Sequence, residues 1–152
     1  MLTDDHWLSE LNLNLLATVR LDRLLIPQMI ERGAGAVVHV TSIQSVLPLP
    51  DATTAYAAAK AALRTYSKSI SKELGPKGVR VNAVSPGPVV TGGTEEMLGD
   101  YIGMLGRGTI RGRAADPDEI ASVVAFLAGP GSSYINGSIV LADGGAVSAM
   151  PS

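Results

Sequence analysis

The sequence contains no cysteine and only two histidines among its 152 residues. The missing cysteines exclude disulfide bonds, thiolate metal sites and a thiol nucleophile. Two histidines are too few for a histidine-rich metal site, so we expect no bound metal. No apolar run approaches the roughly 18 residues that a membrane-spanning helix needs, and the chain does not open with the pattern of a signal peptide. We therefore expect a cytoplasmic protein that makes no contact with a membrane.

Charge of either sign is also scarce, since charged residues make up 17% of the chain and the net charge is −2. Such a chain is poorly suited to neutralise the phosphates of a nucleic acid, so we expect no nucleic-acid partner. Apolar residues make up 46% of the chain, which excludes intrinsic disorder. The length of 152 residues corresponds to one ordinary domain.

Helical and strand patterns alternate along the chain. An apolar stripe predicts a helix over 3–32, capped by Thr3 and bent at Pro27, and further helices are expected over 54–74, near 95–105 and from Pro117 to about Gly129. Short apolar runs typical of buried parallel strands occupy 36–40, 79–84 and 139–142. The alternation predicts an α/β fold in which three parallel strands have helices on both faces. Because no strand precedes 36–40 to cover its open edge, the pattern indicates a piece of a larger sheet.

Tyr56 and Lys60 are four residues apart and therefore share one face of the helix expected there. A phenol, whose ordinary pKa is near 10, becomes an acid or base at neutral pH when a nearby ammonium favours the phenolate. The alternative, a tyrosine at a helix start beside a solvated lysine, is the commoner explanation of this spacing alone.

Two further features converge on the same edge of the expected sheet. Ser42 follows the strand over 36–40, and the strand over 79–84 leads into Pro86 and Gly87. Open α/β sheets bind ligands at the carboxyl ends of their strands. A hydroxyl, a phenol–ammonium pair and a sharp backbone turn are therefore expected together. Taken alone, without Tyr56 and Lys60, Ser42 is better explained as a hydroxyl at the end of a strand that caps a turn.

The sequence resembles the short-chain dehydrogenase/reductase family. Seven segments carry the resemblance, in the family's order and near its spacing: 7–15 (WLSELNLNL), 37–42 (VVHVTS), 56–63 (YAAAKAAL), 78–87 (GVRVNAVSPG), 112–121 (GRAADPDEIA), 126–128 (FLA) and 143–145 (DGG). The resemblance implies an NAD(P)-dependent oxidoreductase that interconverts a ketone and a secondary alcohol, with NAD or NADP as the coenzyme. It also implies a homo-oligomer, either a dimer or a tetramer.

The resemblance implies roles for four catalytic residues. Tyr56 is the general acid or base, and Lys60 lowers the pKa of that phenol and holds the nicotinamide ribose. Ser42 bonds the substrate oxygen, and Asn14 holds a water that links Lys60 to solvent. Asn14 is chosen over Asn12 because it stands seven residues after the tryptophan, as in the family.

The resemblance also assigns a cofactor-binding segment. Besides Tyr56 and Lys60, the residues expected to line the nicotinamide are Pro86, Gly87, Val89 and Thr91. Residues 91–113 correspond to a lid over a small carbonyl or alcohol substrate. The apolar residues of this lid, which begin at Met97, either line the substrate pocket or pack on the core.

The sequence departs from the family in two respects. Ser42 and Tyr56 are fourteen positions apart, one more than is usual, so the loop between them must absorb a residue near 48–50; Ser45 is the rival hydroxyl. The family's glycine-rich phosphate turn is absent. The expected fold is therefore a partial doubly wound, Rossmann-like sheet without its N-terminal dinucleotide-binding half, with 1–152 as the C-terminal half of one domain. The alternative is a truncated, non-catalytic chain that acts only in oligomerisation or interaction.

Other polar residues have ordinary explanations. Arg107, Arg111 and Arg113 form either a phosphate-binding patch or a solvated rim of the lid, and solvated clusters are the commoner case. His39 lies in the middle of a strand, and we expect it to be buried with its hydrogen bonds made.

Overall fold

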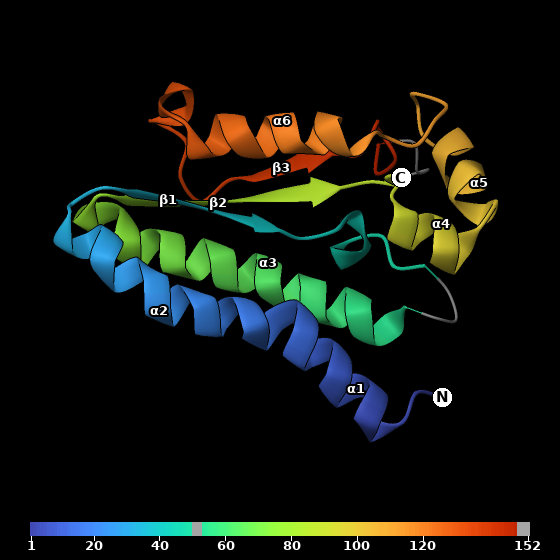
Figure 1. Cartoon of the computed structure of the whole chain (residues 1–152), viewed down its shortest axis with the longest axis horizontal. Helices are drawn as coiled ribbons and strands as arrows, with labels where there is room; N and C mark the ends of the chain where they lie inside the picture. The colour runs from blue at the N-terminus through green and yellow to red at the C-terminus, as the bar shows by residue number, and fades with distance from the viewer. Residues whose placement is uncertain (50–52, 149–152) are drawn as a thin grey trace.

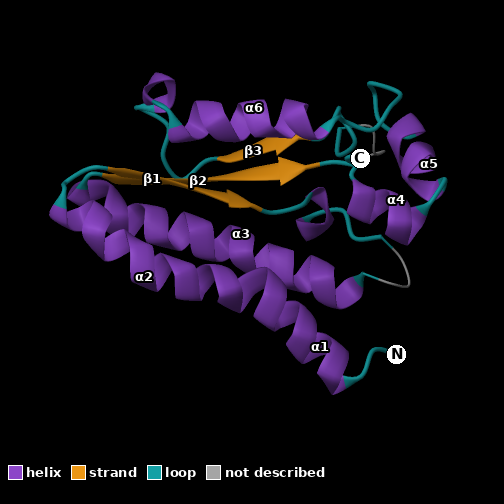
Figure 2. Cartoon of the chain, in the orientation of Figure 1, coloured by secondary structure: helices purple, strands orange, loops and turns teal. Residues whose placement is uncertain are grey.

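The computed structural model describes residues 1–49 and 53–148. Three strands, β1 (Gly35–Val40), β2 (Val79–Pro86) and β3 (Ile139–Ala142), form a parallel sheet in the order β1-β2-β3. The main helices are α1 (Asp4–Leu11), α2 (Ala17–Glu31), α3 (Thr54–Leu74), α4 (Gly92–Leu98), α5 (Tyr101–Arg107) and α6 (Pro117–Ala128). Helices α2 and α3 cover one face of the sheet and α6 covers the other (Figures 1 and 2). The predicted α/β fold with a three-stranded parallel sheet is confirmed.

The central strand β2 forms the core of the molecule. Val79, Val81, Ala83 and Val84 of β2 are all 0% exposed, as expected for a parallel strand that is covered on both faces. Val79 and Val81 pack with apolar residues of α2 and α3, among them Ile26. Burial of a side chain of this size contributes about 1.5–3 kcal/mol. The strand is thus a rigid support for the residues that follow it.

The N-terminal helical region is not one helix, as 3–32 was predicted to be. A single π-helical turn at Asn12–Leu16 separates α1 from α2, and its backbone bond runs from Ala17 N–H to the carbonyl of Asn12. Thr3 caps α1 as predicted, because its hydroxyl accepts from the backbone N–H of His6 at 3.4 Å. Helix α2 continues through Pro27, so the irregular turn lies at 12–16 instead.

Two further element boundaries differ from those predicted. Strand β2 runs to Pro86, beyond the predicted end at residue 84, because Pro86 pairs with Ala142 of β3. The single helix predicted near 95–105 is two helices, α4 and α5. Gly99, with φ +51°, separates them because that conformation ends a right-handed helix. The start of α6 matches the prediction, with Asp116 and Glu119 forming a capping box.

The remaining expectations concern the open edge of β1, membrane-spanning helices and the loop near 48–50. In residues 1–49 and 53–148, β1 pairs only with β2, so its other edge carries no strand. Within the same ranges, no helix has both the length and the hydrophobicity that crossing a membrane requires. Part of the loop expected to absorb an extra residue, at 50–52, lies outside the described residues, as do 149–152 at the end of the expected domain.

Candidate active site

The pairing of β1 with β2 brings two strand ends to one edge of the sheet. Val40 is the register partner of Val84, and Thr41 continues the alignment by donating its N–H and its hydroxyl to the Val84 carbonyl at 2.8 and 2.9 Å. Ser42 lies two positions after Val40, and Pro86 lies two positions after Val84. The expected convergence of these residues on the carboxyl edge is therefore present.

Ser42 is held by the short 3-10 turn that it caps. Its side-chain oxygen accepts the backbone N–H of Gln44 at 3.1 Å, and the residue is 8% exposed. Ser42 also lies close enough to Tyr56 for its hydroxyl to act on the pKa of the phenol. The hydroxyl of Ser45, in contrast, is buried and has no partner among the described residues. Of the two candidate serines, Ser42 is the one whose hydroxyl acts on the pKa of the phenol.

Tyr56 and Lys60 lie in the first two turns of α3, on one face as predicted. The Lys60 ammonium nitrogen is 5.6 Å from the centroid of the Tyr56 ring. It donates a hydrogen bond to the Val40 carbonyl at the end of β1, at 3.1 Å. Buried alanines at 55, 57 and 59 let this end of the helix pack closely. The bond to Val40 fixes the helix that carries the phenol to the strand that leads to Ser42.

Burial and the Glu10 carboxylate shift the pKa values of Tyr56 and Lys60. Burial raises the pKa of Tyr56, the Ser42 hydrogen bond opposes that rise, and the negative charge of Glu10 adds to it. Burial lowers the pKa of Lys60, while Glu10 opposes the decrease. The pKa of Tyr56 is therefore raised, whereas Lys60 alone was expected to lower it. The Lys60 ammonium lies over the Tyr56 ring and bonds the Val40 carbonyl, and burial removes solvation from the phenol.

Asn14 lies in the π-helical turn and faces the same carboxylate. Its side-chain amide donates to Glu10 Oε2 at 2.7 Å. Asn12 instead accepts from exposed Arg20 at 3.1 Å. Single π-helical turns occur frequently at functional sites. The sequence interpretation overlooked Glu10, although its position four residues before Asn14 is the spacing at which two side chains meet on a helix.

The segment after β2 is held rigidly at the same edge. A Cβ at Gly87 would come within 2.8 Å of the Asp143 Cα, so only glycine fits this turn without a shift. Val89 forms a parallel bridge with Ala115, and its carbonyl accepts the hydroxyl of Thr94 at 2.8 Å. Thr91 caps α4 in a reciprocal pair with Thr94. The proposed cofactor-lining residues thus belong to one fixed turn, in which backbone groups are the main polar features.

The segment expected to form a lid contains α4 and α5, which lie beyond the carboxyl ends of the strands (Figure 1). Ile102 is buried, whereas Tyr101 and Met104 are 41% and 57% exposed, so only part of the apolar stretch packs on the core. Arg113 forms two bonds to Glu119, at 2.7 and 2.8 Å. Its guanidinium is therefore engaged in an exposed ion pair, as expected for a solvated rim.

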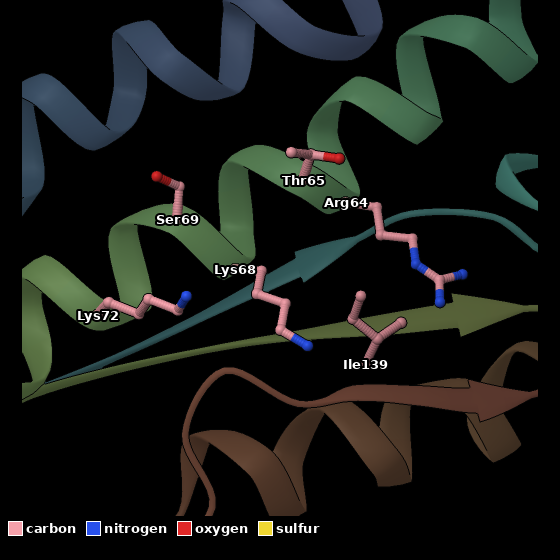
Figure 3. Close-up of a pocket in the computed structure, with 6 residues that line it drawn as sticks. All are labelled: Arg64, Thr65, Lys68, Ser69, Lys72 and Ile139. Atoms are coloured by element: carbon pink, nitrogen blue, oxygen red, sulfur yellow. The ribbon is translucent and has the colours of Figure 1, made fainter.

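A groove of 340 Å³ runs along α3 from one turn beyond Lys60 (Figure 3). Figure 3 shows Arg64 and Lys68 extending from α3 over the strands toward Ile139 of β3. Ser42 and Tyr56 are not among the lining residues: Arg64, Thr65, Lys68, Ser69, Lys72 and Ile139. The candidate site is thus separate from this basic groove.

The chain is similar to known proteins in sequence and in fold. The family model described as "Enoyl-(Acyl carrier protein) reductase" matches residues 1–147. The 3-oxoacyl-[acyl-carrier-protein] reductase of Chlamydia trachomatis is 37% identical over 144 residues, which cover 95% of this chain and 58% of that protein. L-sorbose reductase of Gluconobacter frateurii, solved with NADPH and L-sorbose, is 34% identical with a TM-score of 0.86, over 96% of this chain and 60% of that one.

The chain thus spans somewhat more than half the length of the relatives that it matches. Within that span the match extends over nearly the whole chain, in sequence and in fold. From these matches together with the phenol, ammonium and serine at the carboxyl edge of a parallel sheet, we conclude that the chain belongs to the short-chain dehydrogenase/reductase family.

Proposed function

We propose that residues 1–152 form the catalytic half of an NAD(P)-dependent oxidoreductase that interconverts a ketone and a secondary alcohol. The observation that carries this proposal is the Lys60 ammonium, which lies 5.6 Å from the Tyr56 ring centroid and bonds the Val40 carbonyl two residues before Ser42, at the edge where an open α/β sheet binds its ligands. We further propose that the three strands are part of a doubly wound sheet and that residues 91–113 form the lid. We also propose a cytoplasmic location for the protein.

The residues of the site fit the nicotinamide end of a dinucleotide. An ammonium has three N–H donors, and Lys60 gives one to Val40, which leaves donors for the ribose hydroxyls. The fixed turn that contains Pro86, Gly87, Val89 and Thr91 offers backbone groups to the carboxamide. The sequence has no glycine-rich turn for the pyrophosphate. When bound, the nicotinamide supplies or accepts the hydride.

Tyr56 acts in this proposal as the proton donor for carbonyl reduction. Its raised pKa keeps the phenol protonated at neutral pH, which is the form that donates a proton to an oxygen gaining negative charge. The Ser42 hydroxyl, which is close enough to the phenol to act on its pKa, polarises the same oxygen. Asn14, beside Glu10, holds a water through which Lys60 exchanges protons with solvent.

The names of the relatives support a carbonyl or alcohol as the substrate. Reductases of a 3-oxoacyl thioester, of acetoacetyl-CoA and of L-sorbose are among the similar proteins, and their substrates share a carbonyl group. Solved relatives with NADPH or NADP bound support a nicotinamide coenzyme. The second candidate is a non-catalytic interaction element, which the large apolar side chains exposed on α1 and α2 favour.

Substitutions at the site test the proposed chemistry. In a protein that joins a dinucleotide-binding half to these residues, Tyr56→Phe removes the proton donor and lowers kcat about 10²- to 10⁴-fold with coenzyme affinity nearly unchanged. Ser42→Ala lowers kcat by roughly 10²- to 10³-fold because one polarising donor is lost. Lys60→Ala lowers kcat and also weakens coenzyme binding. Steady-state kinetics and coenzyme titration measure both effects.

Ser45→Ala is the matched control for Ser42→Ala. The hydroxyl of Ser45 has no partner in the described structure, so its removal leaves kcat unchanged. Two results would contradict the assignment: full activity in Tyr56→Phe, or a greater loss in Ser45→Ala than in Ser42→Ala.

A second prediction concerns the pKa of the phenol. Glu10→Gln removes a negative charge that disfavours the phenolate but keeps an oxygen to accept the Asn14 amide, so the pKa of Tyr56 falls. Carbon-13 NMR of ring-labelled tyrosine measures this titration in the 152-residue chain, with Tyr56→Phe to assign the signal. Glu31→Gln, at the far end of α2, is the control. A Tyr56 titration that is the same in both variants would refute the role of Glu10.

A third prediction separates the two candidate functions. The 152-residue chain binds NADPH or NADH more weakly than micromolar, because it lacks the phosphate turn that the dinucleotide requires. Isothermal titration calorimetry measures the affinity. Micromolar binding would show that the chain holds the coenzyme without that turn. Weak binding that persists in the joined protein favours the non-catalytic alternative.

A fourth prediction concerns the proposed homo-oligomer. Helices α1 and α2 and the turn between them expose large apolar side chains, with Leu13 and Leu24 at 71% and 70% exposure. Large exposed apolar areas mark association surfaces. We expect dimers or tetramers by light scattering at tens of micromolar, and a shift toward monomers in the Leu13→Glu, Leu24→Glu double variant. A wild-type monomer that unfolds in one sharp transition would contradict the prediction.

A further inference from the structure

A buried carboxylate connects α2, β1 and α3 at a point farther from the carboxyl edge of the sheet than the candidate site. Asp22 of α2 is only 7% exposed. One of its oxygens, Oδ2, accepts the hydroxyl of Tyr66 from α3 at 2.9 Å and lies 3.1 Å from Nε2 of His39 in β1. The His39 and Tyr66 rings also lie against each other, with centroids 5.9 Å apart and a tilt of 33°. A single oxygen atom thus connects two helices and a strand.

The chemistry of this contact fixes which groups donate. A carboxylate only accepts hydrogen bonds, so both the phenol and the imidazole Nε2 must carry a proton toward it. The other ring nitrogen of His39, Nδ1, is buried without a partner among the described residues. The expected satisfied histidine is therefore satisfied at one nitrogen only. Breaking the bond from His39 leaves both nitrogens of a buried ring unpaired, which costs far more free energy than the same loss at the surface.

The network lies at a similar depth below the site in all three elements. Asp22 lies eight residues after Asn14, which is about 12 Å at the rise of a helix. Tyr66 lies six residues beyond Lys60, about 9 Å along α3. His39 lies three residues before Ser42, about 10 Å along extended chain. Helix α2, which continues from the turn of Asn14, strand β1, which leads to Ser42, and helix α3, which carries Tyr56 and Lys60, therefore each contribute one residue to the same contact.

We infer that Asp22 is a positioning residue of this site, which sets α2, β1 and α3 in one mutual register by binding His39 and Tyr66 at a single oxygen. The inference rests on the proposed function for its catalytic consequence. Helices and paired strands are stiff over such short lengths, so a slip at the network is transmitted to the site. A displacement of about 1 Å at the reacting groups costs on the order of 100-fold in rate.

The competing explanation is a polar contact that contributes only to stability. The two explanations differ in their effect on Tyr56, which forms no hydrogen bond with the network in the described part of the chain and lies ten residues from Tyr66 in the sequence. If the network positions α3, loss of one bond alters the surroundings of Tyr56. If it only stabilises the fold, the surroundings of Tyr56 stay as they are in any variant that folds.

The test uses the 152-residue chain, whose four tyrosines and two histidines give few NMR signals. A long-range proton–nitrogen correlation first shows a proton on Nε2 of His39. Tyr66→Phe then removes one bond, and the carbon-13 signal and titration of Tyr56 shift. Ile26→Val, in a core cluster on the same helix, destabilises the fold without removing a hydrogen bond of the network and leaves the Tyr56 signal in place.

A pair of histidine variants checks the donor directly. His39→Leu removes the donor and shifts the Tyr56 signal, whereas His39→Gln keeps an N–H near the position of Nε2 and restores it. In the joined protein, Tyr66→Phe lowers kcat about 10- to 100-fold while KM for the coenzyme stays the same, and Ile26→Val changes neither constant.

Three results would overturn the inference: an Nε2 without a proton, a Tyr56 signal that is unmoved in Tyr66→Phe, or an equal shift in Ile26→Val. The NMR measurements do not require activity. If the wild-type joined protein is inactive while the Tyr56 signal responds to Tyr66→Phe, the proposed function fails and the positioning role stands.

Discussion

The parallel pairing of β1 with β2 is the constraint on which the rest of the structure depends. Two parallel neighbours cannot be joined by a tight turn, so the chain must return across the sheet through a long connection, here α3. A helix in that position has to begin at the edge where β1 ends. Tyr56 and Lys60 therefore meet Ser42 because of the topology, and the bond from Lys60 to Val40 closes the arrangement.

Partial burial then determines the chemistry available at that edge. Loss of solvation shifts the pKa values of Tyr56 and Lys60 in opposite directions, and both shifts favour the neutral forms. A single negative charge at Glu10 adds to the first shift and opposes the second. Its combined effect favours a protonated phenol beside a protonated amine. This combination suits donation of a proton to an oxygen more than removal of one.

Much of this arrangement could be predicted from the sequence because its signals are local. The alanine-rich run and the glycines after it gave both ends of α3, and the acid–proline pattern at Asp116 gave the start of α6. The π-helical turn could not be read in this way, since its apolar residues fit a regular helix equally well. The contacts of Asp22 lie 17 and 44 residues away in the sequence, so no local pattern contains them.

The π-helical turn has a consequence for how the two N-terminal helices can vary. A turn closed by a bond over five residues instead of four holds one residue more than a regular turn, and one residue corresponds to roughly 100° of rotation about a helix axis. Helix α2 has its rotation set by Asp22 in the core, whereas α1 has its own cap at Thr3. The extra residue lets α1 and α2 each keep its own rotation about the helix axis. Substitutions along α1 can therefore reshape one wall of the site while the core beneath it stays unchanged.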